Sequence, residues 1–152
     1  MAVTSAETHP ALHQWPRPEV APHGPEHLAK VHIEEAETLA PALEAFIRWE
    51  MKERNRFVFQ GAWITPEFAA RKCAESKTVR AVFIDEPVAG EILASMLVRS
   101  GRTEPSERQL VMSQTAFLYG NWIRERAQQL GLPCVAARPR ETLAVRILAA
   151  AG

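Results

Sequence analysis

The spacing of apolar residues predicts that helices and short strands alternate along the chain. Between residues 33 and 54, apolar side chains recur every three or four positions, which is typical of a helix with one buried face. Pro41 lies inside this stretch, so we expect the regular helix to begin near it. The apolar positions of this helix are Leu39, Leu43, Phe46, Ile47 and Met51.

A short apolar run follows this helix and predicts a central strand. Phe57, Val58 and Phe59 do not alternate with polar residues, which favours a strand covered on both faces of a parallel sheet. Gly61 would end this strand, and Pro66 suits the first position of a helix. In open α/β sheets, ligands bind outside the carboxyl ends of the strands. We therefore expect the functional site to include residues 60–65.

The remainder of the chain continues the alternation. Ser106 and Gln109 form the pattern of a capping box, and Gly131 suits the end of the helix that this box begins. Alternation of this kind indicates an α/β fold, in which helices flank a parallel sheet. We expect helices over residues 66–74, 88–97, 107–130 and 142–150, and strands over residues 57–60, 79–84 and 133–137.

The first 32 residues differ in composition from the rest. They contain all five histidines and five of the eleven prolines, with little periodic apolar pattern. The chain is therefore divided into an irregular Pro/His-rich segment, residues 1–32, and an α/β domain, residues 33–152. The histidine spacings match no metal-binding motif, so we expect no metal site among them.

The overall composition excludes several classes of function. The chain has 152 residues, of which 47% are hydrophobic, and its 18 basic residues balance 18 acidic ones. A net charge of zero does not favour a nucleic-acid partner. No apolar run approaches the roughly 20 residues that cross a bilayer, so we expect no membrane partner.

Cys73 and Cys134 form no CxxC pair, which suits a cytoplasmic location. We expect the four tryptophans, Trp15, Trp49, Trp63 and Trp122, mainly in the core.

Several features together resemble a known family. One strand ends in Gln60-Gly61-Ala62, another ends in Asp85-Glu86-Pro87, and the last leads into residues 137–143, Ala-Arg-Pro-Arg-Glu-Thr-Leu. An arginine-bearing break precedes the long helix, and residues 2–13 are similar to a segment that follows the second strand of the family. The chain thus resembles the carboxyl-terminal two-thirds of a P-loop kinase-like, AAA-type ATPase of the small-molecule kinase group. The resemblance implies a P-loop NTPase-like three-layer sandwich.

The chain departs from this family at its most specific motif. It contains no GxxxxGK[ST] sequence, the loop that holds nucleotide phosphates and Mg²⁺. We therefore expect a truncated or degenerate kinase-like protein whose sheet lacks its first strand. In this form it would bind ATP weakly or not at all. Such a sheet would expose apolar surface, through which we expect homodimers to form.

The resemblance also implies roles for arginines at two sites. Arg99 and Arg102 correspond to a lid that closes over a transferring phosphoryl group, and Asp85 would orient Mg²⁺ or water. Arg138, Pro139 and Arg140 correspond to a loop beside the adenine of ATP. The alternative for all these arginines is that they are ordinary solvated residues of loops and helix ends, and Asp85 is also a common turn residue.

The substrate site is expected at the first glycine turn. Gln60, Gly61 and Trp63 would contact the phosphoryl acceptor, although Gln60 cannot act as a strong Mg²⁺ ligand or as a base. The full-length form would use ATP and Mg²⁺ to phosphorylate a small-molecule substrate. The competing hypothesis is a non-catalytic α/β module that binds a metabolite or a partner chain through the same edge of the sheet.

Overall fold

The computed structural model describes residues 5, 7–13, 23–53 and 56–152. These residues form mostly helices, joined to one small sheet. The two strands are β1 (Phe83–Asp85) and β2 (Cys134–Ala136), and the short 3₁₀ helices are η1 (Pro10–His13) and η3 (Arg140–Thr142). The α-helices are α1 (Gly24–Lys52), α2 (Pro66–Glu75), α3 (Ala89–Ser100), α4 (Glu107–Gln129) and α5 (Leu143–Ala151).

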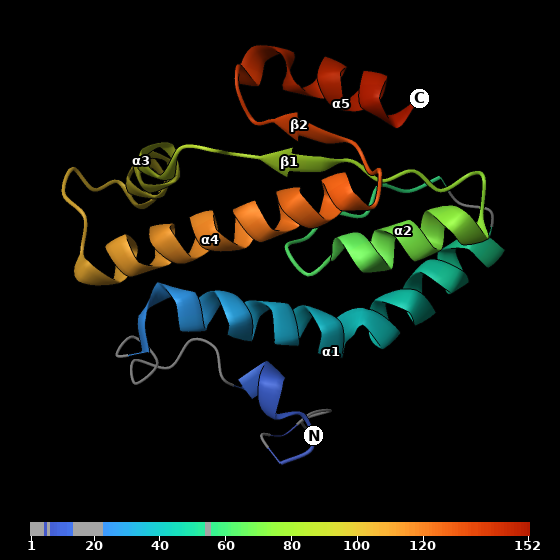
Figure 1. Cartoon of the computed structure of the whole chain (residues 1–152), viewed down its shortest axis with the longest axis horizontal. Coiled ribbons are helices and arrows are strands. Elements are labelled where there is room, and N and C mark those ends of the chain that lie inside the picture. The colour runs from blue at the N-terminus through green and yellow to red at the C-terminus, as the bar shows by residue number, and fades with distance from the viewer. Residues whose placement is uncertain (1–4, 6, 14–22, 54–55) are drawn as a thin grey trace.

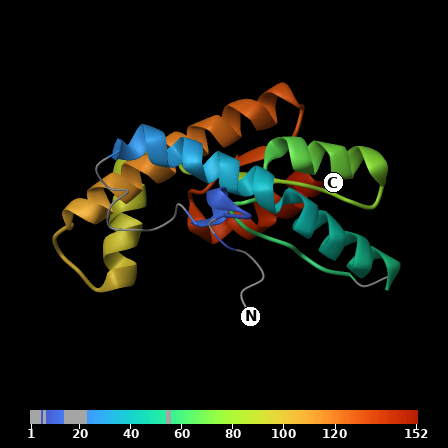
Figure 2. The same cartoon turned by 90° about the horizontal axis from the view of Figure 1, so that it is seen from below.

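Helix α4 lies at the centre of this arrangement. It packs against α1, α2, α3 and both strands. Figure 1 shows α1 below α4, and the two strands between α4 and α5. The view from below in Figure 2 shows the carboxyl-terminal half of α1 extending away from α4. The first half of α1 is therefore the part that packs on α4.

The buried core joins α1 to α4. Ala29 of α1 clusters with Tyr119 and Ile123 of α4, and Ile33, Phe83, Leu118 and Trp122 pack around them. Ala36 and Ala127 are fully buried, since their exposed fraction is 0%. Small residues at these positions allow helix backbones to approach closely. All of the buried residues of α1 lie between Leu28 and Ala36, so its second half contributes none.

The sheet consists of two parallel strands of three residues each among the described residues. Phe83, Ile84 and Asp85 pair with Cys134, Val135 and Ala136, respectively. The prediction of an α/β three-layer sandwich was therefore wrong, and so was the resemblance to a P-loop kinase fold. Helices α1 and α4 bury their apolar faces on each other, so most of the core forms without a sheet.

The predicted central strand is not formed. Residues 56–60 have no regular secondary structure, and 95% of the Val58 surface is exposed. An apolar run becomes a buried strand only where neighbouring strands pair with it, and no described strand lies against this one. The predicted strand over residues 79–84 is likewise reduced to β1.

The first long helix begins earlier than the position of Pro41 predicts. Helix α1 starts at Gly24 and includes Pro41, and the buried face over residues 28–36 stabilises this early part. Figure 1 shows that the two halves of α1 run in different directions. Residue 33, where we divide the chain, lies inside this helix, and the division into domains stays a prediction.

Local helix signals gave correct predictions elsewhere. The capping box is present at Ser106, where Gln109 donates its backbone N–H to the Ser106 side chain, and α4 follows directly. Gly131, just beyond α4, has a φ of 68°, a left-handed conformation that glycine adopts freely. Helix α2 begins at Pro66 as predicted, and the side chain of Thr65 caps it.

The tryptophans are less buried than predicted. Trp49 is 56% exposed and Trp63 is 44% exposed. Trp122 packs against the core cluster, whereas Trp15 lies outside the described residues. The expectation of a core position was therefore wrong for Trp49 and Trp63, because no described element covers them.

The partly buried His32 should make folding sensitive to acid. Its ring lies edge-on to Tyr119 with centroids 4.5 Å apart, and its Nδ1 is 3.4 Å from a carboxylate oxygen of Glu35. Burial lowers the pKa of His32, although Glu35 opposes this effect. Neutral His32 therefore stabilises the native state fully above about pH 6.5, and this contribution declines as the pH falls through the folded-state pKa.

We predict that His32→Phe makes the melting temperature less dependent on pH between pH 7 and pH 5. The exposed His27 on the same helix is the matched control, so His27→Phe should leave the pH dependence unchanged. Thermal unfolding followed by circular dichroism measures both. Equal pH dependence in the wild type and His32→Phe would contradict the prediction.

Candidate functional site

Three of the predicted site arginines line one hollow. Arg99 lies in the last turn of α3, and Arg138 and Arg140 follow β2. The hollow between these segments has a volume of about 550 Å³. It lies at the carboxyl ends of the parallel strands, where α/β proteins commonly bind ligands. Its lining residues are Glu91, Ala94, Ser95, Val98, Arg99, Arg138 and Arg140.

Two of these arginines are held in place by neighbouring side chains. The Nε atom of Arg138 is 2.8 Å from a carboxylate oxygen of Glu86, and its Nη2 atom pairs with Glu91. Arg140 donates a hydrogen bond of 2.7 Å from Nη2 to the hydroxyl of Ser95. These contacts link the loop after β2 to α3, and they orient two guanidinium groups along the hollow.

Arg99 differs from the other two arginines in its contacts. Within the part of the chain that the structure describes, it forms neither an ion pair nor a side-chain hydrogen bond, whereas Arg138 pairs with two carboxylates and Arg140 donates to Ser95. The lining carries three positive side chains, and the carboxylates of Glu91 and Glu86 both pair with Arg138, which leaves an excess of one positive charge. Such an excess of positive charge attracts anions, and guanidinium groups match the geometry of phosphate and carboxylate oxygens.

The remaining predicted lid and loop residues lie outside the lining. Arg102 is exposed in the turn after α3 and is not among the residues around the hollow. Pro139 separates the two lining arginines, and the bond that joins it to Arg138 is a cis peptide. The structure thus brings together Arg99, Arg138 and Arg140 from the predicted set, but not Arg102.

Asp85 faces α4 instead of the hollow. Its Oδ2 atom accepts a hydrogen bond of 2.8 Å from Arg124, which also donates to the side chain of Asn121. Asp85 is 8% exposed, and its Oδ1 atom has no hydrogen-bond partner among the described residues. Burial and the charge of Asp85 both raise the pKa of the neighbouring Cys134 thiol. The observed role of Asp85 is to attach β1 to α4.

The predicted acceptor residues form no shared site with the arginines. Gln60, Gly61 and Trp63 are exposed in the segment before α2, and none of them lines the hollow. This segment is fixed to α4 by Tyr119, whose hydroxyl donates a hydrogen bond of 2.5 Å to the carbonyl of Ala62. The structure therefore separates the two groups of residues that the sequence placed at one active site.

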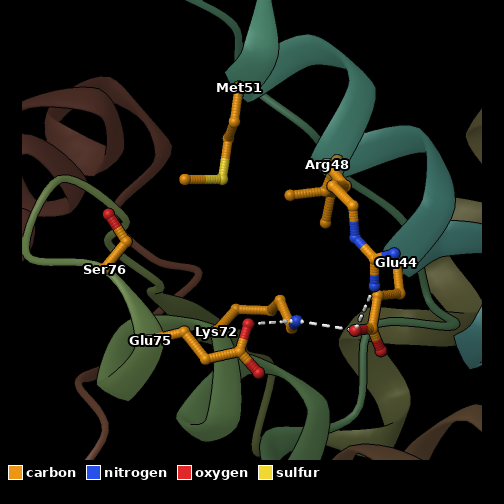
Figure 3. A pocket seen from close by; sticks show the side chains of 7 residues that line it. Glu44, Arg48, Met51, Lys72, Glu75 and Ser76 are labelled. Atoms are coloured by element: carbon orange, nitrogen blue, oxygen red, sulfur yellow. Dashed lines mark hydrogen bonds and ion pairs between the residues drawn. The ribbon is translucent and has the colours of Figure 1, made fainter.

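A second hollow lies between the second half of α1 and α2. It encloses about 210 Å³, and its lining residues are Glu44, Ile47, Arg48, Met51, Lys72, Glu75 and Ser76. Figure 3 shows Lys72 reaching from α2 to a position between the carboxylates of Glu44 and Glu75. The Lys72 ammonium lies 3.1 Å from a Glu44 oxygen and also pairs with Glu75.

The charges of the second hollow are already paired. Glu44 also contacts Arg48 and Arg71, at 3.1 and 3.2 Å, respectively. The hydrogen bond to Glu75 raises the pKa of Lys72, and the hydrogen bond from Lys72 lowers the pKa of Glu44. We therefore interpret this network as the attachment of α2 to the second half of α1. The arginine hollow is the better candidate for ligand binding, because Arg99 in its lining has no ion-pair partner among the described residues.

Sequence reasoning missed the two polar residues that line the arginine hollow beside its arginines. Glu91 and Ser95 precede Arg99 by eight and four positions, a spacing that places all three on one face of a helix. That spacing was a usable signal. The contacts of Glu91 with Arg138 and of Ser95 with Arg140 had no such signal, because they join residues more than 40 positions apart.

The described residues provide no obvious metal centre or membrane segment. No three His, Cys, Asp or Glu side chains within them are grouped so that they could hold a metal ion. None of the helices in the described ranges combines the length and apolar character that a bilayer crossing needs. The use of ATP and Mg²⁺ stays a prediction.

We predict that Lys72→Met lowers the melting temperature at neutral pH by about 2 to 4 °C. Lys72 stabilises the fold below its unfolded-state pKa of about 10.4, and this contribution is lost as the pH rises through the higher folded-state pKa. Glu44 contributes above about pH 4.3, and its contribution is lost as the pH falls through its lower folded-state pKa.

The effect of Lys72→Met should therefore be largest between about pH 5 and pH 10 and should shrink in acid. Lys77→Met provides a control, because Lys77 is exposed just beyond α2 and forms no ion pair among the described residues. Melting curves across this pH range measure both variants. An equal effect of the two substitutions at pH 7 would contradict the prediction.

The comparisons with known proteins do not assign the chain to a family. No protein-family model, curated protein or solved structure matches it. The function must therefore be argued from the arginine hollow itself.

Proposed function

We propose that this protein is a binding module for a phosphorylated small molecule, which it holds in the arginine hollow. The observation that supports the proposal is the convergence of Arg99, Arg138 and Arg140 on one hollow at the carboxyl ends of two parallel strands. The three residues come from two segments about 40 positions apart. Their convergence is thus a result of tertiary structure and not of a local cluster of charge.

The three arginines would contribute to anion binding in different ways. Arg138 and Arg140 are oriented by Glu86 and Ser95, so little conformational entropy is lost when an anion contacts them. Arg99 supplies a guanidinium group without an intramolecular competitor among the described residues. Glu91 lies in the same lining, where its carboxylate accepts hydrogen bonds. A phosphate ester that also carries hydroxyl groups would satisfy both kinds of group.

The solvent exposure of the site limits the expected affinity. Arg138 retains 41% of its side-chain exposure, and water screens charges at such positions. We therefore expect dissociation constants between micromolar and millimolar values, with binding that weakens as salt is added. The proposal does not include phosphoryl transfer, because the kinase prediction depended on a P-loop fold that the structure does not form. The homodimer predicted from the sequence relied on a sheet without its first strand, a fold that the structure does not form, and it stays an untested prediction.

We predict that Arg99→Gln weakens the binding of phosphate esters about tenfold, because hydrogen bonds to charged groups are worth about 1.5 to 3 kcal/mol each. Titrations at low ionic strength, followed by NMR, would use inorganic phosphate, glycerol phosphate and ATP with or without Mg²⁺. Amide signals of α3 and of residues 138–140 should shift with the ligand.

Arg102→Gln is the matched control for this titration. Arg102 lies three positions beyond Arg99, is exposed and does not line the hollow. It removes the same charge and should weaken binding only slightly. Equal losses in the two variants would indicate nonspecific attraction and would contradict a site in the hollow, as would the absence of shifts at α3.

A further inference from the structure

The second half of α1 carries an apolar stripe that the rest of the chain leaves exposed. Ala42, Ala45, Phe46 and Trp49 follow the i, i+3, i+4, i+7 spacing of a helix face that packs on a neighbour. All four residues are exposed, with 43% of the Phe46 surface and 56% of the Trp49 surface accessible. We call these four residues the α1 stripe. Its spacing is that of a buried face, although it lies at the surface.

The segment after α1 extends this apolar surface. The Phe46 ring lies 5.5 Å from the Phe59 ring and 6.4 Å from the Trp49 ring, measured between centroids. Phe57 and Val58, next to Phe59, are 38% and 95% exposed. The rings of Trp49, Phe46 and Phe59 therefore form one contiguous aromatic cluster. Contiguous aromatic surface of this kind marks sites of protein association.

The α1 stripe is complementary to a second copy of itself. If two α1 helices pack antiparallel about a two-fold axis between positions 45 and 46, Ala42 of one copy faces Trp49 of the other. Ala45 likewise faces Phe46. Each large aromatic side chain then lies against a small alanine, the alternation that fills a helix interface without voids. A two-fold axis also closes the assembly at two copies.

We propose that the protein forms a homodimer through antiparallel packing of the α1 stripe against the same stripe of a second copy. This interface differs from the sheet surface that the sequence predicts, and it does not depend on anion binding in the arginine hollow. The hollow lies between α3 and the loop after β2, so both copies would keep it.

Sedimentation velocity measures the oligomeric state, with circular dichroism as a check that each variant retains its helices. The wild type should be a dimer at about 50 µM, which requires a dimer dissociation constant in the micromolar range or below. Trp49→Ala should weaken the dimer by at least about 30-fold, since buried aromatic residues dominate interface energies. A monomeric wild type at this concentration would overturn the proposal.

The double variant Ala42→Trp/Trp49→Ala tests the antiparallel register. It exchanges the large and small residues and so keeps a tryptophan opposite an alanine at both contacts. Dimerisation should return to within about fivefold of the wild type, because the paired volumes are conserved. A helical double variant that stays monomeric would overturn this register.

Two further variants separate the α1 stripe from other exposed apolar surface. Leu148→Glu changes a residue of α5 that is 73% exposed and should leave the dimer intact. Ile84→Lys changes the exposed residue of β1 and should also leave it intact. If Ile84→Lys dissociates the dimer and Trp49→Ala does not, the interface lies on the sheet and the proposal is wrong.

Discussion

The packing of α4 against α1 is the interaction on which the other contacts of the fold depend. Tyr119 and Ile123 meet Ala29 in the core, and Ala36 of α1 and Ala127 of α4 are fully buried. Single polar contacts then attach the surrounding elements to α4. Arg124 holds β1 through Asp85, Arg126 holds α2 through Glu67, and the Tyr119 hydroxyl holds the segment before α2.

The position of α4 also determines where the arginine hollow forms. Helix α3 packs against α4, and β1 attaches to α4 through Asp85, so α3 and the strand pair keep a fixed relative position. The loop after β2 then reaches α3 through the contacts of Arg138 with Glu91 and of Arg140 with Ser95. The segments that line the hollow are therefore held in place by α4, although the lining side chains lie at the surface. A site supported in this way requires little reorganisation when an anion binds.

The same central helix leaves part of α1 uncovered. Residues 28–36 of α1 supply all its buried side chains, and among the described residues the second half of the helix is attached through Glu44 to Lys72 and through Phe46 to Phe59. The side of the helix opposite Glu44 carries the α1 stripe. One helix of 23 residues cannot cover all of a neighbour of 29 residues that changes direction along its length. The exposed aromatic surface and the proposed dimer are consequences of this mismatch.

The sequence by itself determined the features that depend on neighbouring residues. The capping box of Ser106 and Gln109, the helix start at Thr65 and Pro66, and the left-handed Gly131 all use hydrogen bonds or dihedral preferences within a few positions. The arginines at the ends of α3 and β2 were likewise visible in the sequence. Tertiary structure alone decided whether Phe57 to Phe59 paired as a strand, how far α1 extended before Pro41, and which arginines share a hollow. Each of these depends on contacts between distant segments, and a local sequence pattern gives no information about how favourable those contacts are.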